Sequence, residues 1–133
     1  MTIFSKIISG AIPSYKIAED ERFLAFLDIA PMARGHVLVV PKIEVDKLFD
    51  LGDDYLSEML VFAKPIAHAI EASFKCKRCG IAVIGLDVPH AHIHLIPLNS
   101  ADDLNFNRKK LSLSPDQFTE VQQVLQHALD KHP

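Results

Sequence analysis

The sequence predicts an α+β domain in which a mainly antiparallel sheet packs against one long helix and a C-terminal helix. Two observations predict this fold class. Short strand-like segments follow one another across tight turns, and two longer segments carry apolar residues at helical spacing. The chain has 133 residues, of which 49% are hydrophobic and 23% charged, an ordinary balance for a globular protein. We therefore expect one domain over residues 1–133.

The first third of the chain predicts a short helix followed by a hairpin and a third strand. Residues 4–12 suit a helix that glycine and proline end. Strands are expected at 15–18 and 23–27, joined by the turn Glu19-Asp20-Glu21. A loop follows, and the β-branched run at 36–40 predicts the next strand.

The middle of the chain predicts the long helix, over residues 53–74. Pro65 lies inside it, so we expect a kink or two separate helices. The predicted buried stripe comprises Leu56, Leu60, Ala63, Ala67, Ile70 and Phe74, broadened by Met59, Phe62 and Ile66. Strands are then expected at 80–85 and 88–97, and Ser114-Pro115-Asp116 predicts the start of the last helix.

Composition excludes several classes of protein. A net charge of −3 argues against a general nucleic-acid binder, which needs a positive surface. The N-terminus lacks the pattern of a secretory signal, and no apolar run reaches membrane-spanning length. We expect a cytoplasmic protein with neither a nucleic-acid nor a membrane partner.

The two cysteines, Cys76 and Cys79, exclude a disulfide framework and a four-thiolate zinc site. A redox pair, or half of a zinc site completed by histidines, remains open. We favour two reduced thiols in a loop before a strand.

The most informative feature is a row of three histidines at alternate positions, His90, His92 and His94. On a strand they share one face. A purely structural role would require three polar partners inside an apolar layer. Two functional interpretations remain: a zinc site with an open position for water, and covalent catalysis by one imidazole assisted by the others.

The segment 90–96 resembles the histidine triad family. Further blocks at 3–13, 19–21, 25–31 and 35–42 stand in the family's order, so the resemblance covers residues 3–97. Residues 98–133 form a C-terminal extension with its helix. The resemblance implies a HIT-like fold with a five-stranded sheet, and a homodimer whose sheets join across the interface.

The resemblance also implies a nucleotidyl hydrolase that removes a substituent from the α-phosphate of a purine nucleotide. The substrate would be a nucleoside phosphoramidate or a dinucleoside polyphosphate, and no cofactor is implied. His92 would be the nucleophile and form a nucleotidyl-imidazole intermediate. His94 and His36 would bond phosphate oxygens or orient the ring, and His90 would hold or relay a proton toward the leaving group.

Nucleotide-binding positions follow from the same resemblance. Asp28 matches the acid that binds the ribose hydroxyls. Apart from the resemblance, the missing side chain of Gly85 would let the phosphate approach the main chain, and an ordinary turn or bulge at Gly85 remains equally open. The positions that sandwich the base are Ile3, Phe4, Ile7, Phe26 and Ile29.

The chain departs from the family in two places. Many members bind a structural zinc through positions that hold Thr2, Ser5 and Glu44 here, so we predict no such zinc. Leu86 and Asp87 replace polar residues that contact the phosphate or assist the leaving group. A carboxylate at Asp87 would repel phosphate, hold a histidine protonated, or act as a general acid.

Two further points stay open at this stage. Residues 105–110 either contact the phosphate or form a solvated loop, and we favour the loop. A non-catalytic nucleotide-binding regulator, and less readily a zinc-dependent phosphoesterase, are the alternatives to the hydrolase.

Overall fold

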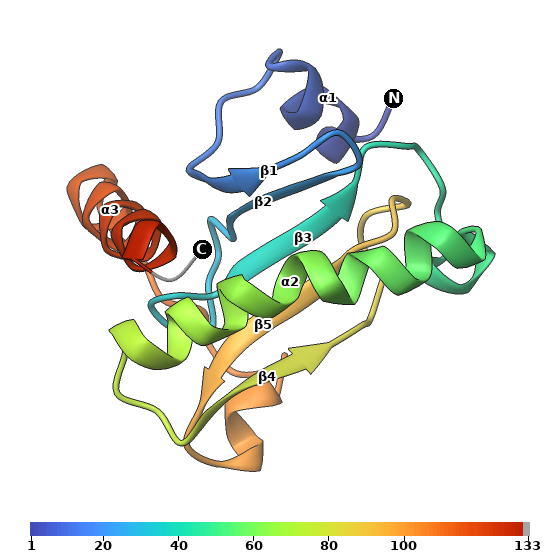
Figure 1. Cartoon of the computed structure of the whole chain (residues 1–133). Helices are drawn as coiled ribbons and strands as arrows, with labels where there is room; N and C mark the ends of the chain where they lie inside the picture. Colours follow the sequence, from blue (N-terminus) through green and yellow to red (C-terminus); the bar gives the residue numbers. More distant parts are fainter. Residues whose placement is uncertain (132–133) are drawn as a thin grey trace.

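The computed structural model describes residues 1–131, so His132 and Pro133 of the predicted domain lie outside the described residues. A five-stranded sheet is surrounded by three α-helices (Figure 1). In chain order the elements are α1 (Ile3–Ser9), β1 (Lys16–Glu19), β2 (Phe23–Leu27), β3 (Val37–Pro41), the 3-10 turn η1 (Leu48–Asp50), α2 (Asp53–Ser73), β4 (Arg78–Ala82), β5 (Ile93–Leu98), the 3-10 turn η2 (Ala101–Leu104) and α3 (Pro115–Lys131).

The sheet has the strand order β1-β2-β3-β5-β4, and every neighbouring pair is antiparallel. This confirms the predicted α+β fold with a five-stranded antiparallel sheet, a long helix and a C-terminal helix. β4 lies at one edge and β1 at the other.

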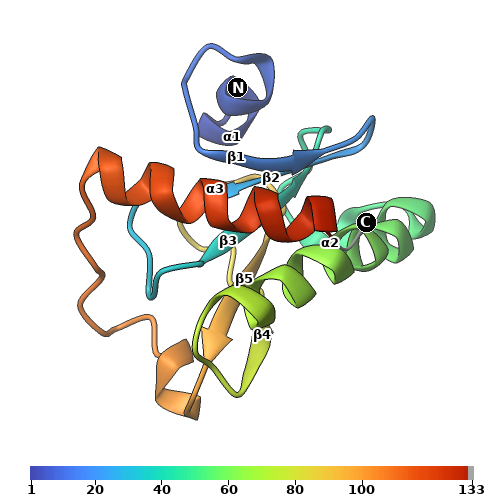
Figure 2. The same ribbon diagram turned by 60° about the vertical axis from the view of Figure 1, so that its left-hand side comes forward.

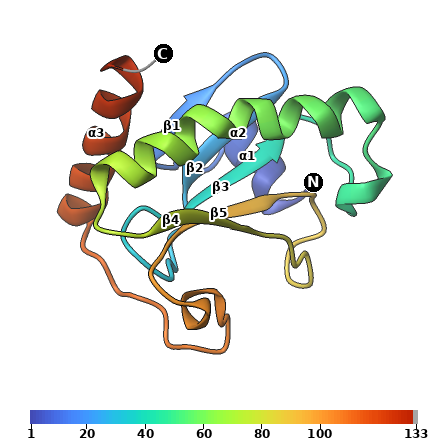
Figure 3. The same ribbon diagram turned by 60° about the horizontal axis from the view of Figure 1, so that its bottom comes forward.

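Both faces of the central strands are covered. Strands β2 and β3 are buried along their whole length, and alternate residues enter two different clusters because successive side chains point to opposite faces. On one face Ala25 and Val39 pack in the main core with α2 and α3. On the other face Phe26 and Leu38 pack with Phe4 of α1. Figures 2 and 3 show α3 crossing beside α2, and α2 lying along one side of the sheet.

The long helix differs from its prediction in two respects. It is one helix from Asp53 to Ser73 although Pro65 lies inside it, so of the two expected alternatives, a kink or two separate helices, the second is wrong. The buried stripe is also rotated. Met59 and Ile66 are buried while Leu60 is 58% exposed, because the helix turns Leu60 away from the sheet.

Element boundaries differ where glycines take positive φ. Gly10 ends α1 at Ser9 with φ 84°, three residues before the expected end. β4 occupies 78–82 instead of 80–85, and Gly85 lies in the segment after it, with φ 69°. The histidine segment joins the sheet late: β5 begins at Ile93, and of the three histidines only His94 lies in the strand.

None of the helices formed by residues 1–131 is long and apolar enough to span a membrane.

Candidate active site

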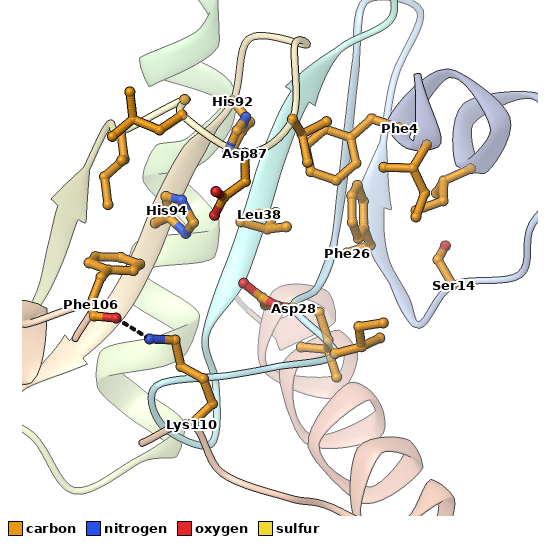
Figure 4. A pocket seen from close by; sticks show the side chains of 18 of the residues that line it. Phe4, Ser14, Phe26, Asp28, Leu38, Asp87, His92, His94, Phe106 and Lys110 are labelled. Atoms are coloured by element: carbon orange, nitrogen blue, oxygen red, sulfur yellow. Dashed lines mark hydrogen bonds between the residues drawn. The ribbon is translucent and has the colours of Figure 1, made fainter. Parts of the chain in front are cut away.

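A cavity of about 500 Å³ opens on the α1 side of the sheet (Figure 4). β5 brings His94 there because its register pairs His94 with Leu38, and Leu38 faces the same side as Phe26. Ten of the predicted site residues line this cavity: Ile3, Phe4, Ile7, Phe26, Asp28, Ile29, Gly85, Asp87, His92 and His94. The two other predicted site residues, His36 and His90, are both 1% exposed and lie behind the lining.

His92 has a defined tautomer. Its Nδ1 lies 2.7 Å from the backbone carbonyl oxygen of His90. A carbonyl oxygen can only accept, so Nδ1 carries the proton and donates, and Nε2 keeps its lone pair. Burial lowers the pKa of His92, with the bond to His90 opposing the shift. Near neutral pH the ring is therefore uncharged and offers a bare nitrogen in the cavity lining.

His36 and His94 form the second part of the site. The backbone N–H of Met32 donates to His36 Nδ1 at 2.9 Å, so the neutral His36 ring carries its proton on Nε2. That nitrogen lies 2.9 Å from His94 Nδ1, which must accept. His94 then carries its proton on Nε2.

Burial keeps this histidine pair uncharged. It lowers the pKa of His36 to about 3 and that of His94 to about 4. Phe106 packs edge-on against the His94 ring, with a centroid distance of 4.9 Å. The pair therefore presents a fixed N–H donor, His94 Nε2–H, beside the bare nitrogen of His92.

Asp28 stands at the end of β2 and is the acid of this cavity. Its Oδ1 accepts the backbone N–H of Ala30, and its Oδ2 lies 3.5 Å from His36 Nε2. Burial raises the pKa of the carboxyl group. One carboxylate oxygen remains available to accept a ligand hydroxyl.

His90 is turned away from the cavity. Its Nε2 donates to the backbone carbonyl of Pro41 at 2.9 Å, and its Nδ1 lies 2.9 Å from Thr2 Oγ1. Thr2 in turn contacts Ser5, and both bond to Glu44. Thr2, Ser5 and Glu44 stand at the positions that bind a structural zinc in many members of the family that the sequence resembles. They do not fit a zinc ion, because two of the three are hydroxyl groups and their polar atoms contact one another and His90.

The geometry does not favour the alternative interpretation in which the three histidines of the row share one metal ion. Both ring nitrogens of His90 are already bonded elsewhere, outside the cavity lining. Among the described residues, the group whose ligand atoms lie within 4.8 Å of one another is Asp28, His36 and His94. These three side chains could hold a divalent cation, although the pair of histidines already has a complete hydrogen-bond arrangement without one.

The C-terminal extension contributes lining residues that were expected in a solvated loop. Phe106, Asn107 and Lys110 all line the cavity. The Lys110 ammonium group donates to the backbone carbonyls of Phe106 and Arg108, which holds it beside the aromatic ring. One aromatic residue in an otherwise polar segment, followed by basic residues, was the signal in the sequence for this contribution.

Cys76 and Cys79 are free thiols outside this cavity. Burial raises the pKa of both, and that of Cys79 to about 12. Neither thiol is therefore activated as a nucleophile.

Comparison with known proteins finds relatives that match most of the chain. Residues 9–101 match the family model described as the HIT domain. An uncharacterized HIT-like protein of Borreliella burgdorferi is 37% identical over 127 residues, covering 90% of this chain and 91% of that protein. The adenosine 5'-monophosphoramidase HNT1 of Saccharomyces cerevisiae is 40% identical over 96 residues, covering 71% of this chain and 61% of the yeast protein.

Solved structures of similar fold include proteins of the same family. A Zn-bound histidine triad family protein from Mycobacterium smegmatis superposes with a TM-score of 0.82 and 33% identity, covering 97% of this chain and 93% of that one. A Hit-like protein from Bartonella henselae also gives a TM-score of 0.82, with 27% identity and coverage of 96% and 95%. Because sequence, fold and the histidine-lined cavity all agree, the chain belongs to the histidine triad (HIT) family.

Proposed function

We propose that this protein is a nucleotidyl hydrolase that cleaves a substituent from the α-phosphate of a purine nucleotide through a covalent nucleotidyl-His92 intermediate. The observation that carries the proposal is the 2.7 Å bond from His92 Nδ1 to the carbonyl oxygen of His90. It leaves Nε2 of a neutral imidazole as a nucleophile in the cavity lining.

The reaction divides into two displacements. In the first, Nε2 of His92 bonds to the α-phosphorus, the bond between phosphorus and the leaving group breaks, and the departing amine takes up a proton from solvent. In the second, water attacks the same phosphorus and releases a proton to solvent, the nitrogen–phosphorus bond breaks, and the lone pair returns to Nε2. His94 Nε2–H donates to a phosphate oxygen in both steps. The bond that His36 Nε2 donates to His94 Nδ1 keeps the proton of His94 on Nε2.

The remaining lining suits a nucleoside. Phe4 and Phe26 pack edge to face at 5.5 Å and, with isoleucines on either side, form an apolar slot for the base. Asp28 provides an acceptor for the ribose hydroxyls. Gly85 has φ 69°, and a Cβ added there would meet no atom within 4 Å, so its main chain is open to the phosphate.

Asp87 bears on the choice of leaving group. It lines the cavity with His92, and its negative charge acts against the lowering of the His92 pKa. A carboxylate here stabilises the positive charge that develops on a departing amine as it takes up a proton, and it repels a departing polyphosphate. We therefore rank a nucleoside phosphoramidate above a dinucleoside polyphosphate as the substrate. The relatives named as adenosine 5'-monophosphoramidases, at 35–40% identity, support the same order.

The proposed active form is a homodimer. β4 is an edge strand, and α2 packs beside it. Exposed apolar side chains occur on both elements, with Leu60 58%, Val61 70% and Ile81 47% exposed. Pairing of β4 with its copy would bury this surface and join the two sheets. The free thiols support a reducing compartment, the cytoplasm, as the site of action.

The testing experiment measures AMP release from an adenosine phosphoramidate, with and without a chelator. His92→Ala should abolish turnover, whereas the control His68→Ala, on the exposed face of α2, should not change it. Chelator-resistant turnover that requires His92 supports the proposal. Chelator-sensitive turnover would point to a metal on Asp28, His36 and His94, and tight AMP binding without turnover would point to a regulator.

The same assay tests the substrate order. Asp87→Asn removes the negative charge at constant size, so the ratio of turnover on a dinucleoside polyphosphate to turnover on the phosphoramidate should rise. An unchanged ratio would show that Asp87 does not select the leaving group.

A further inference from the structure

A chain of close polar contacts joins His90 to a surface carboxylate. His90 Nδ1 lies 2.9 Å from Thr2 Oγ1, Thr2 Oγ1 lies 3.0 Å from Ser5 Oγ, and Ser5 Oγ donates to Glu44 Oε1 at 2.5 Å. The same Glu44 oxygen accepts the backbone N–H of Thr2 at 2.9 Å. Three separate segments meet here: the start of α1, the segment after β3 and the loop before β5.

The direction of each bond follows from its chemistry. The carbonyl of Pro41 can only accept, so His90 Nε2 carries a proton. The carboxylate of Glu44 can only accept, so Ser5 gives its hydroxyl proton to Glu44. In the neutral form of His90, Nδ1 is therefore bare and accepts the hydroxyl proton of Thr2. With the Ser5 proton on Glu44 and the Thr2 proton on His90, the 3.0 Å contact between the two hydroxyl oxygens carries no proton.

This arrangement is a helix cap completed from outside the helix. Thr2 is the N-cap of α1, and its Oγ1 accepts the N–H of Ser5 at 3.0 Å. In a capping box, the third residue of the helix returns a bond to the N–H of the cap residue. Ser5 occupies that position and is too short, and Glu44 from another segment makes the bond instead. Glu44 holds the backbone N–H of Thr2 and takes the hydroxyl proton of Ser5, so the Thr2 hydroxyl is left to donate to His90.

We propose that Glu44 and Thr2 are positioning residues that hold His90, and through it the nucleophile His92. The proposal rests on the proposed function of His92. His90 is held at both ring nitrogens, and its backbone carbonyl is the acceptor that sets the His92 tautomer. Without the Thr2 donor, the His90 ring keeps a bond at one nitrogen alone. The peptide that carries the carbonyl is then held by that bond and by the backbone bonds from His90 N–H to Val88 and from Ala91 N–H to Val45.

A merely structural role of the same residues would have a different kinetic effect. α1 carries Phe4, whose ring lines the base slot and lies 5.0 Å from the His92 ring. If Thr2 served only to hold α1 in place, its loss would weaken nucleotide binding and raise KM. A positioning role for the nucleophile lowers kcat and leaves KM unchanged, because the interaction with the transition state is the one that is lost.

The test uses the full chain with two matched pairs of variants. Thr2→Val removes the hydroxyl and Thr2→Ser keeps it. Glu44→Gln changes the acceptor, and Glu21→Gln changes an exposed acid in the turn between β1 and β2. Each is assayed for kcat and KM on an adenosine phosphoramidate. The ¹⁵N resonance of His90 Nδ1 is recorded in labelled protein as a readout that does not depend on turnover.

We expect Thr2→Val to lower kcat about tenfold, the lower end of the effect of removing an outer partner of a functional imidazole. Glu44→Gln should give a smaller loss, and Thr2→Ser and Glu21→Gln should retain the kcat of the unaltered protein. The Nδ1 resonance of His90 should shift in Thr2→Val and stay in place in Thr2→Ser. Unchanged kcat with raised KM in Thr2→Val, or an unshifted resonance, would overturn the proposal. Turnover that survives in His92→Ala would overturn the proposed function instead, so the two failures are distinguishable.

Discussion

Nε2 of His36 lies 2.9 Å from Nδ1 of His94, and the bond between them orders the protons of the site. His36 is 1% exposed and receives the N–H of Met32 on its other nitrogen. Its remaining proton can only point to His94. A backbone amide at residue 32 thus determines which nitrogen of His94 donates toward the cavity.

The first prediction concerns His36. His36→Asn keeps an acceptor for the Met32 N–H but removes the donor to His94. His94 then loses the bond that fixes its tautomer, and kcat should fall about a hundredfold, within the range for a lost proton-donor arrangement. Steady-state kinetics on an adenosine phosphoramidate measure this effect. A kcat equal to that of the unaltered protein would show that the His94 tautomer does not matter.

The second prediction concerns stability and pH. The pKa of His36 falls from 6.5 to about 3 on folding and that of His94 to about 4, so the unfolded chain binds more protons below pH 6.5. Stability from these two groups is present above pH 6.5 and is lost as the pH falls below it. At about pH 5.5 the contribution of each buried histidine to the free energy of unfolding should be about 1 kcal/mol lower than at neutral pH.

Urea unfolding at the two pH values measures this loss. His36→Asn removes one of the titrating groups, so the stability of this variant should fall by about 1 kcal/mol less over the same interval. An equal pH dependence in the variant and in the unaltered protein would contradict the assignment.

The third prediction concerns Asp28. Asp28→Asn should weaken AMP binding about tenfold, because it replaces a charged acceptor of the ribose hydroxyls. Binding of an analogue that lacks both ribose hydroxyls should change little. Calorimetry with the two ligands makes the comparison, and Asp46→Asn, at an exposed bend, is the control. Equal losses of affinity for both ligands would show that Asp28 does not bind the ribose hydroxyls.

The fourth prediction concerns the homodimer. Val61→Glu and Ile81→Lys place charges on exposed apolar positions of α2 and β4 and should convert a dimer into a monomer, as measured by light scattering. Val124→Gln, on α3, should leave the dimer intact. A monomer for the unaltered protein at micromolar concentration, or a dimer for both charged variants, would contradict pairing through β4.

Much of the fold was predictable because each strand carries its own signal. The apolar runs at 23–27 and 36–40 predicted β2 with its observed bounds and β3 to within one residue. The histidine strand was the main error. Alternation of His90, His92 and His94 predicts a strand throughout, yet positions 83–92 leave the sheet and β5 starts at Ile93. Where a strand begins depends on its register with β3 and β4, and that register is a tertiary property.

The cavity was predictable residue by residue through the family pattern, which is why ten of the twelve predicted residues line it. The family pattern does not predict which way each side chain points. It could not show that both ring nitrogens of His90 bond away from the cavity, because Thr2 and Pro41 are distant in sequence. Phe106 and Lys110 lie outside the blocks that resemble the family, and only the folded C-terminal extension brings them to the site.

The central claim is the covalent bond between His92 and phosphorus, and the stereochemical course of the reaction tests it most directly. An adenosine phosphoramidate with a chiral α-phosphorothioate is hydrolysed in isotopically labelled water, and the configuration of the product is determined. Two successive displacements, first by His92 Nε2 and then by water, predict retention of configuration. Inversion would mean that water attacks phosphorus directly, and would contradict the role assigned to His92.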